Sequence, residues 1–260
     1  MGRARTPAGA NNDWYRFYAP RRLAALTAER ILEDRARAER DLDAVLARTG
    51  LSSADRILEI GCGWGRHSLA LARRGFGRVV SVDIAPEPLG LARALAREAG
   101  LDCDLRQQDF SLVDDGPYAA VLSLYDRSVC GFPSESEDAR SLRHLAGLLE
   151  PGGWLVFGID DWPRDLPEAS ERRRETAEGL ERIEVVPEPA ARTCTHRVTL
   201  AGPDGREETH ALTRRHYSLP ELRQLLTDTG FAPLAALHRL AAERLYAEGG
   251  EGLFVYARRA

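Results

Sequence analysis

The chain has 260 residues, a formal net charge of −4 at pH 7 and no lysine among its 36 basic residues. The absence of lysine excludes a Schiff base on a protein amine, a P-loop and a kinase-type strand lysine, because each of these sites requires the lysine amine. The mild acidity argues against a nucleic-acid binder, since that affinity rests on neutralising phosphates. No apolar run is long enough to span a membrane as a helix.

The first two thirds of the chain alternate short apolar runs with amphipathic stretches of helical length. Such alternation predicts an α/β fold, a doubly wound and mostly parallel sheet of Rossmann-like type with helices on its faces. A tail is expected at 1–12 and an aromatic cluster at 14–18. Strands are expected at 55–60, 78–83, 103–106, 118–125 and 154–159, and helices at 21–49, 66–74, 86–99 and 135–150. The last of these helices begins with a capping box made by Ser134 and Glu137.

Residues 163–216 break this alternation. The charged run Glu168–Glu184 predicts a helix, and two alternating segments, 193–200 and 207–213, predict a β-hairpin joined by Gly-Pro-Asp-Gly. We therefore expect an inserted hairpin rather than a second domain. The exposed edge of that hairpin could pair with the same edge of a second copy, which would give a homodimer.

The end of the chain is expected to complete the main sheet. Ser218 and Glu221 form a capping box that predicts a helix, and two final strands, 231–240 and 253–258, are expected as an antiparallel pair at the sheet edge, which gives seven strands in all. The whole chain is interpreted as one domain. Its parts are a tail and helical cap (1–50), a cofactor-binding core (51–162), a lid or substrate insertion (163–216), and the last helix with the edge strands (217–260).

A glycine-rich turn follows the first predicted strand. Glycines at a strand's carboxyl end let the backbone approach a ligand closely. The turn is Glu59-Ile60-Gly61-Cys62-Gly63-Trp64-Gly65, and Arg66 stands where a dinucleotide fingerprint has its third glycine. This replacement disfavours the rival reading as an NAD-dependent oxidoreductase.

Acidic residues follow the next two strands. Asp83 ends the second strand, where a carboxylate accepts hydrogen bonds from ribose hydroxyls. Asp109 follows the third strand, where it could accept from an adenine amino group while Phe110 covers the ring; an ordinary turn acid is the alternative. Glu59 could orient the glycine loop or meet an ammonium group. These three acids, with no phosphate-binding lysine, indicate a positively charged nucleoside.

The chain resembles the class I S-adenosyl-methionine-dependent methyltransferases in four motifs. They are E-I-G-C-G-W-G-R-H-S, V-D-I-A, Q-D-F and L-E-P-G-G, within residues 55–160. The form C-G-W-G-R-H-S, the aromatic N-terminal segment and R-H-Y-S-L-P-E-L are similar to the small-molecule subgroup. That subgroup includes glycine, amino-sugar and antibiotic N-methyltransferases.

The resemblance implies S-adenosyl-methionine as cofactor and assigns its contacts. The methionine part is expected at Gly61, Gly63 and Gly65, the ribose at Asp83, the adenine at Ile84, Asp109 and Phe110, and the cofactor backbone at Leu124, with Glu59, Cys62 and Tyr18 adjoining the cofactor.

Methyl transfer is an in-line displacement, so the protein mainly supplies alignment, exclusion of water and, in some cases, a base. Asp126 is the candidate that positions or deprotonates the acceptor, and Tyr18 the one that closes over the cofactor. The alternative for Asp126 is that it caps its own loop or pairs with Arg127. The alternative for Tyr18 is that its ring only packs in a terminal helix. Candidate substrate contacts are Tyr15, Tyr125, Arg127, Phe132, His216 and Tyr217.

The reaction expected from the sequence is methyl transfer to a small molecule, at an amine nitrogen of a metabolite or natural product. O- or C-methylation of a secondary metabolite, or a cofactor-binding protein with repurposed activity, are the alternatives. No histidine spacing fits a metal site. The four scattered cysteines are typical of a reducing cytoplasm. We expect no nucleic-acid or membrane partner.

Overall fold

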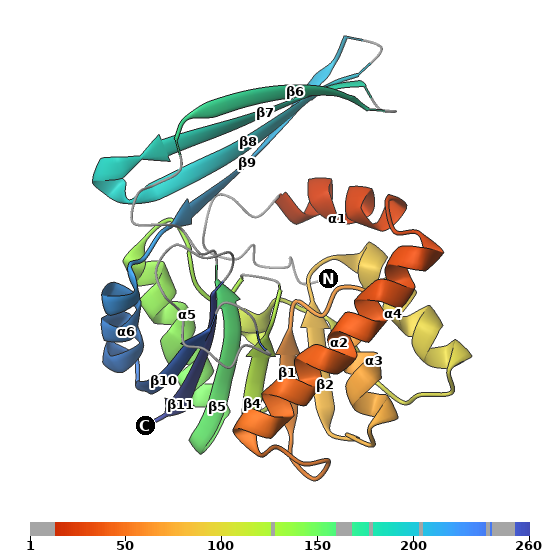
Figure 1. Cartoon of the computed structure of the whole chain (residues 1–260), viewed down its shortest axis with the longest axis vertical. Coiled ribbons are helices and arrows are strands. Elements are labelled where there is room, and N and C mark those ends of the chain that lie inside the picture. Colours follow the sequence, from red (N-terminus) through yellow and green to blue (C-terminus); the bar gives the residue numbers. More distant parts are fainter. Residues whose placement is uncertain are drawn as a thin grey trace, which may run out of the picture.

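Within the residues that the structure describes, a seven-stranded sheet covered by helices forms the body of the protein (Figure 1). A second, four-stranded sheet lies above this body; we call the two the main sheet and the upper sheet. The coordinates are a computed structural model. The structure describes residues 14–125, 128–159, 168–176, 179–202, 205–237, 240 and 253–260.

The main sheet has the strand order β10-β11-β5-β4-β1-β2-β3. The five N-terminal strands are parallel, and β11 is antiparallel to both β5 and β10, which confirms the predicted sheet and its antiparallel edge. The strand order reverses direction between β1 and β4, the kind of point where such sheets bind ligands. The strands are β1 (Ile57–Ile60), β2 (Val79–Asp83), β3 (Asp104–Gln107), β4 (Tyr118–Ser123), β5 (Leu149–Ile159), β10 (Phe231–Leu237) and β11 (Leu253–Arg259).

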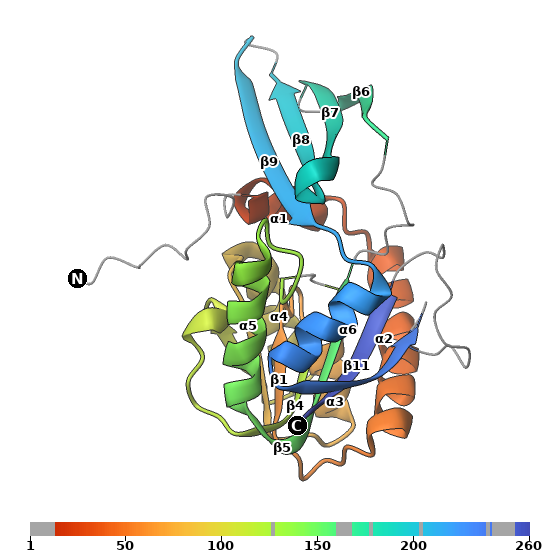
Figure 2. The ribbon, with the colours of Figure 1, turned by 90° about the vertical axis from the view of Figure 1, so that its left-hand side faces the viewer.

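Helices cover the two faces of the main sheet (Figure 2). Alternate residues of β1 point to opposite faces: Ile57 packs with α2 and α3, and Leu58 with α5 and α6. Both predicted capping boxes, at the starts of α5 and α6, are present. β5 begins at Leu149 rather than at the predicted Trp154. The helices are α1 (Trp14–Ala24), α2 (Ala28–Thr49), α3 (Arg66–Arg73), α4 (Pro86–Glu98), α5 (Glu135–Leu148) and α6 (Leu219–Asp228), with short 3-10 turns η1 (Phe110–Leu112) and η2 (Pro189–Ala191).

The N-terminal segment forms two helices, so the prediction of one helix over 21–49 was wrong. The break lies at Thr27, whose backbone is extended (φ −81°, ψ 162°) and whose hydroxyl accepts the backbone N–H of Arg30 at 3.2 Å. The threonine side chain accepts a backbone N–H that has no partner in the helix that begins here, and its extended backbone interrupts any helix that runs up to it. The resulting turn lets α1 lie across the body beneath the upper sheet (Figure 1).

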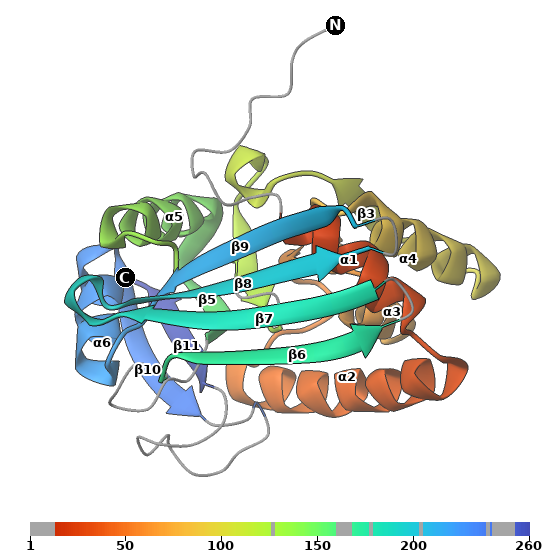
Figure 3. The ribbon, with the colours of Figure 1, turned by 90° about the horizontal axis from the view of Figure 1, so that it is seen from above.

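The upper sheet contradicts the prediction of a helix over Glu168–Glu184. That charged run forms two strands, β6 (Ser170–Thr176) and β7 (Gly179–Glu188), which extend the confirmed hairpin of β8 (Thr193–Ala201) and β9 (Glu207–Arg215). Pairing across strands overrides the helical tendency of the arginine and glutamate residues. For example, Ile183 packs against Val198 of β8 on one face. Figure 3 shows the four strands passing over α1 and the body.

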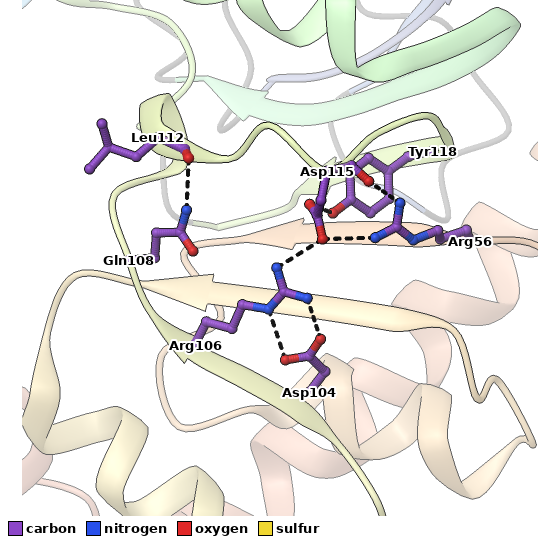
Figure 4. A network of polar contacts seen from close by, with 7 residues as sticks. All are labelled: Arg56, Asp104, Arg106, Gln108, Leu112, Asp115 and Tyr118. Carbon is purple, nitrogen blue, oxygen red and sulfur yellow. Dashed lines mark hydrogen bonds and ion pairs between the residues drawn. The ribbon is translucent and has the colours of Figure 1, made fainter.

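A polar network ties together strands of the main sheet (Figure 4). Arg56, just before β1, and Arg106 of β3 both bind the Asp115 carboxylate, at 2.8 and 3.0 Å, and the Tyr118 hydroxyl donates to it at 2.5 Å. Arg56 and Asp115 precede β1 and β4, at the amino ends of these strands. The network therefore stabilises the edge opposite the glycine loop.

Candidate functional site

The glycine turn lies at the carboxyl end of β1. Gly61, Gly63 and Gly65 have φ values of 67°, 55° and 78°, a left-handed conformation that favours glycine. A side chain at Gly65 would stand 3.0 Å from the Cβ of Ala92 in α4, whereas nothing lies within 4 Å of the Cβ position of Gly63. Gly65 thus lets the loop pack on α4, and Gly63 leaves an open approach for a ligand.

Asp83 stands beside this loop at the end of β2. Its carboxylate accepts the backbone N–H of Gly63 at 2.7 Å and that of Ala85 at 2.8 Å, one on each oxygen. Burial raises the pKa of Asp83. Each carboxylate oxygen has a further lone pair, so both can still accept a ligand hydroxyl. The next residue, Ile84, stands at the same edge of the sheet.

Glu59 is buried beneath the loop and is 3% exposed. Its carboxylate accepts the Ser68 hydroxyl at 2.5 Å and the Ser81 hydroxyl at 3.3 Å, and lies 3.6 Å from His67 Nδ1. These contacts join β1, β2 and the first turn of α3. They are the contacts of a residue that orients the loop, one of the two roles that the sequence left open.

Asp109 and Phe110 follow β3 at the same edge. The Asp109 carboxylate accepts the backbone N–H of Ser111 at 2.9 Å and so caps the short turn η1. Phe110 is half-buried against the core, and its carbonyl accepts from His144 of α5 at 3.1 Å. The turn therefore fixes the Phe110 backbone.

Leu124 and Tyr125 follow β4. Leu124 is buried, and its carbonyl would lie 2.6 Å from a Cβ at Gly158 of β5, so only glycine fits there. The Tyr125 ring stacks on His67 at 5.8 Å and has the Arg66 guanidinium 4.3 Å from its centre. The Tyr125 ring therefore lies against the start of α3, directly after the glycine turn.

The surroundings of Tyr125 are charged and largely buried. Burial and the Asp41 carboxylate raise the pKa of Tyr125 to about 12. His67 lies 3.5 Å from the same carboxylate, and Arg66 pairs with Asp34 at 3.7 Å. Burial lowers the pKa of Arg66. The residue that replaces the third glycine thus joins α3 to α2 beside the site.

Phe132 and Tyr217 meet at Asp138 of α5, and His216 precedes Tyr217 in the chain. The Asp138 carboxylate accepts the Phe132 backbone N–H at 2.9 Å and the Tyr217 hydroxyl at 2.6 Å. His216 is buried, and burial, followed by the charges of His196, Arg214 and Arg192, lowers its pKa to about 4. Sequence reasoning missed Asp138, because an acid in the first turn of a helix is common and carries no separate signal.

The other predicted site residues lie in the N-terminal helix, in the glycine loop or directly after Tyr125. Asp126 and Arg127 lie outside the described residues, and so does the side chain of Tyr18, whose backbone belongs to α1. Tyr15 is half-buried on the same helix. Cys62 is buried within the glycine loop, with its sulfur 3.9 Å from the Gly63 carbonyl.

No cluster of three or more histidine, cysteine, aspartate or glutamate side chains in the described part of the chain could hold a metal ion. None of the helices in that part is both long and apolar enough to cross a bilayer.

Comparison with known proteins identifies the central segment. Residues 57–153 match the family model described as a methyltransferase domain. A ubiquinone biosynthesis O-methyltransferase from Xylella fastidiosa (strain 9a5c) is 37% identical over 117 residues, which are 44% of this chain and 45% of that protein. The chain therefore spans about half the length of this curated relative.

Solved structures extend the likeness to the whole fold. An S-adenosylmethionine-dependent methyltransferase from Clostridium acetobutylicum has a TM-score of 0.71 and 15% identity, over 95% of this chain and 98% of that one. An amino pentose methyltransferase from Micromonospora echinaspora, involved in calicheamicin biosynthesis and solved with its cofactor, has a TM-score of 0.57 and 19% identity, over the full length of both chains. At these identities the likeness establishes the fold.

Proposed function

Because residues 57–153 match a methyltransferase domain and the fold is similar to that of an S-adenosylmethionine-dependent methyltransferase, we propose that this chain transfers a methyl group from S-adenosyl-methionine to a small molecule, at an amine nitrogen. The observation that carries the proposal is the bond between Asp83 and Gly63 beside an open glycine turn. It leaves lone pairs for ribose hydroxyls next to backbone that a ligand can approach.

The cofactor contacts that we propose follow the carboxyl ends of β1, β2, β3 and β4, and we give them in chain order. Gly61, Gly63 and Gly65 take the methionine part, Asp83 the ribose, Ile84, Asp109 and Phe110 the adenine, and Leu124 the cofactor backbone, with Cys62 adjoining the cofactor. Gly63 supports this set because a Cβ there would project into open space rather than into protein. Glu59 stabilises the loop from beneath through Ser68 and Ser81.

When bound, S-adenosyl-methionine supplies a methyl group activated by the positive sulfur. The protein's part is alignment and exclusion of water. We propose that Asp126 positions the acceptor or takes its proton, and that Tyr18 closes over the cofactor from α1. Tyr15, Tyr125, Arg127, Phe132, His216 and Tyr217 are the proposed substrate contacts. Tyr125 fits this role through its place at the end of β4.

The preference for nitrogen rests on the part of the chain that binds the acceptor. A sugar N-methyltransferase from Streptoalloteichus sp., with a TM-score of 0.53 and 19% identity, aligns over all of this chain, upper sheet included, and 98% of its own, whereas the O-methyltransferase matches only 117 residues. Cofactor-binding segments carry little information about the acceptor atom. Transfer to oxygen or carbon remains the second candidate, favoured by the higher identity to the O-methyltransferase.

Isothermal titration calorimetry with S-adenosyl-homocysteine and with NADH tests the cofactor. We expect binding of the first and none of the second; the reverse would overturn the proposal. Transfer of radiolabelled methyl to a panel of amino sugars, simple amines and catechols, followed by mass spectrometry, tests the acceptor atom. Label found only in catechols would favour the second candidate.

A further inference from the structure

The loop between β4 and α5 is fastened to α5 from within. Asp138, which is fully buried, accepts the backbone N–H groups of Gly131 and Phe132 at 2.7 and 2.9 Å on one carboxylate oxygen. The Ser141 hydroxyl, one turn further along α5, donates to the Val129 carbonyl at 2.7 Å. Residues 129–132, which we call the β4–α5 loop, therefore follow the position of this helix.

The second oxygen of the same carboxylate holds a different part of the chain. It accepts the Tyr217 hydroxyl at 2.6 Å, and Tyr217 lies two residues after the end of β9. The last residue of β9 adds two contacts. Its backbone N–H reaches the Gly131 carbonyl at 3.3 Å, and the Arg215 guanidinium lies 3.5 Å from Glu135 of α5. The end of the upper sheet and the β4–α5 loop thus meet at one buried group.

We propose that Asp138 is a positioning residue that couples the upper sheet to the β4–α5 loop, so that two walls of the acceptor pocket keep a fixed relation to each other. The inference rests on the proposed function for its catalytic meaning. Its geometric part concerns only residues on α5, the loop and β9. Asp138 has no exposed surface, so it acts through Phe132 and Tyr217 and not on substrate directly.

The charge of the carboxylate matters to this coupling. The ionised group accepts all three hydrogen bonds, whereas protonation turns one oxygen into a donor. Burial raises the pKa of Asp138 to about 6, and the bond from Tyr217 acts against that rise. The other groups facing it are the Cys130 thiol of the loop, with Arg214 and Arg215 of β9 nearby.

Hydrogen exchange of the full-length protein tests the coupling without any knowledge of the acceptor. Tyr217→Phe keeps the ring and removes one hydroxyl. We expect amide exchange at residues 128–134 to accelerate roughly tenfold or more, the factor that loss of one hydrogen bond to a charged group allows. Ser218→Ala is the matched control, which should accelerate exchange in α6 alone. Unchanged exchange in the loop of Tyr217→Phe would overturn the proposal.

Kinetics then separate positioning from general destabilisation. With an acceptor from the amine panel, Tyr217→Phe and Asp138→Asn should both raise the KM for the acceptor and leave the dissociation constant of S-adenosyl-homocysteine unchanged. Ser218→Ala should change neither. Equal loss of cofactor affinity would contradict the acceptor-side role. Failure of the wild-type protein to bind S-adenosyl-homocysteine would instead refute the proposed function and leave the exchange result intact.

The pH dependence supplies a readout that packing alone would not move. Because the Tyr217 hydroxyl opposes the rise in the pKa of Asp138, Tyr217→Phe should shift the acidic limb of kcat/KM to higher pH. A limb caused by protonation of the amine acceptor would stay in place in the variant, and that result would count against Asp138.

Discussion

The Asp83 carboxylate accepts the backbone N–H of Gly63 at 2.7 Å, which joins the end of β2 to the glycine turn after β1. The acid thereby shapes the loop as well as offering lone pairs for a ligand. A variant at this position should consequently affect both the loop and the affinity for the cofactor, and the two effects can be measured apart.

Asp83→Asn is expected to weaken S-adenosyl-homocysteine binding by roughly 10- to 100-fold. The amide keeps one acceptor oxygen but turns its NH2 toward a backbone N–H, and hydrogen bonds to a charged group contribute about 1.5–3 kcal/mol. Calorimetry gives the affinity. Asp104→Asn, an exposed acid paired with Arg106 on β3, is the control and should bind normally. Equal affinity of Asp83→Asn and wild type would refute the proposed ribose contact.

The two loop glycines should respond differently to alanine. Gly65→Ala combines a φ of 78° with a contact of 3.0 Å to the Cβ of Ala92, so it should unfold at the lower temperature. Gly63→Ala suffers only the left-handed strain of about 1–2 kcal/mol, yet its new methyl projects into the proposed cofactor space. We therefore expect Gly63→Ala to lose more cofactor affinity for a given loss of stability than Gly65→Ala does. Thermal unfolding measures the stability of both variants, and calorimetry measures their affinity for S-adenosyl-homocysteine.

Asp115→Asn should reduce stability and spare cofactor binding, because its network lies at the other edge of the sheet (Figure 4). Burial alone would raise the pKa of Asp115, but the hydrogen bonds from Tyr118 and Arg106 outweigh it and lower the pKa to about 2. The stabilisation is thus present above pH 3.8 and is lost as the pH falls toward 2.

The side chain of Asp115 is 35% exposed, so after allowance for solvent screening we expect a loss of only about 1 kcal/mol. Urea unfolding at pH 7 measures it. A drop in S-adenosyl-homocysteine affinity in this variant would show that the network reaches the site.

Asp138 and His216 should make opposite contributions to stability between pH 4 and 6. The pKa of Asp138 is raised from 3.8 to about 6, so the folded state binds the extra proton there and stability rises as the pH falls. The pKa of His216 is lowered from 6.5 to about 4, so stability falls as the pH falls. Each contribution is on the order of 3 kcal/mol, at 1.36 kcal/mol for each pKa unit.

Single variants separate these two contributions. Asp138→Asn should leave a protein whose free energy of unfolding falls more steeply on acidification from pH 6 to pH 4 than that of the wild type, and His216→Gln should show the reverse. Urea titrations at several pH values test this. Parallel pH profiles for all three proteins would mean that neither group has the shifted pKa.

The sequence by itself predicted the features that local chemistry controls. Glycines at 61, 63 and 65 indicate a left-handed turn because other residues pay steric strain there, and all three have positive φ. Ser134 with Glu137, and Ser218 with Glu221, predict helix starts because each pair bonds reciprocally within four residues. The alternation of apolar runs with helical stretches predicted a mostly parallel sheet, but the order of its strands came from the structure.

Only the tertiary structure decided the features that depend on residues far apart in the chain. Glu168–Glu184 has a helical composition, but it forms β6 and β7 because pairing with β8 places Ile183 against Val198. Asp138 reads as an ordinary acid of a first helical turn. Its function depends on Gly131 and Tyr217, which fold onto it from either side, and no spacing along the sequence encodes that meeting.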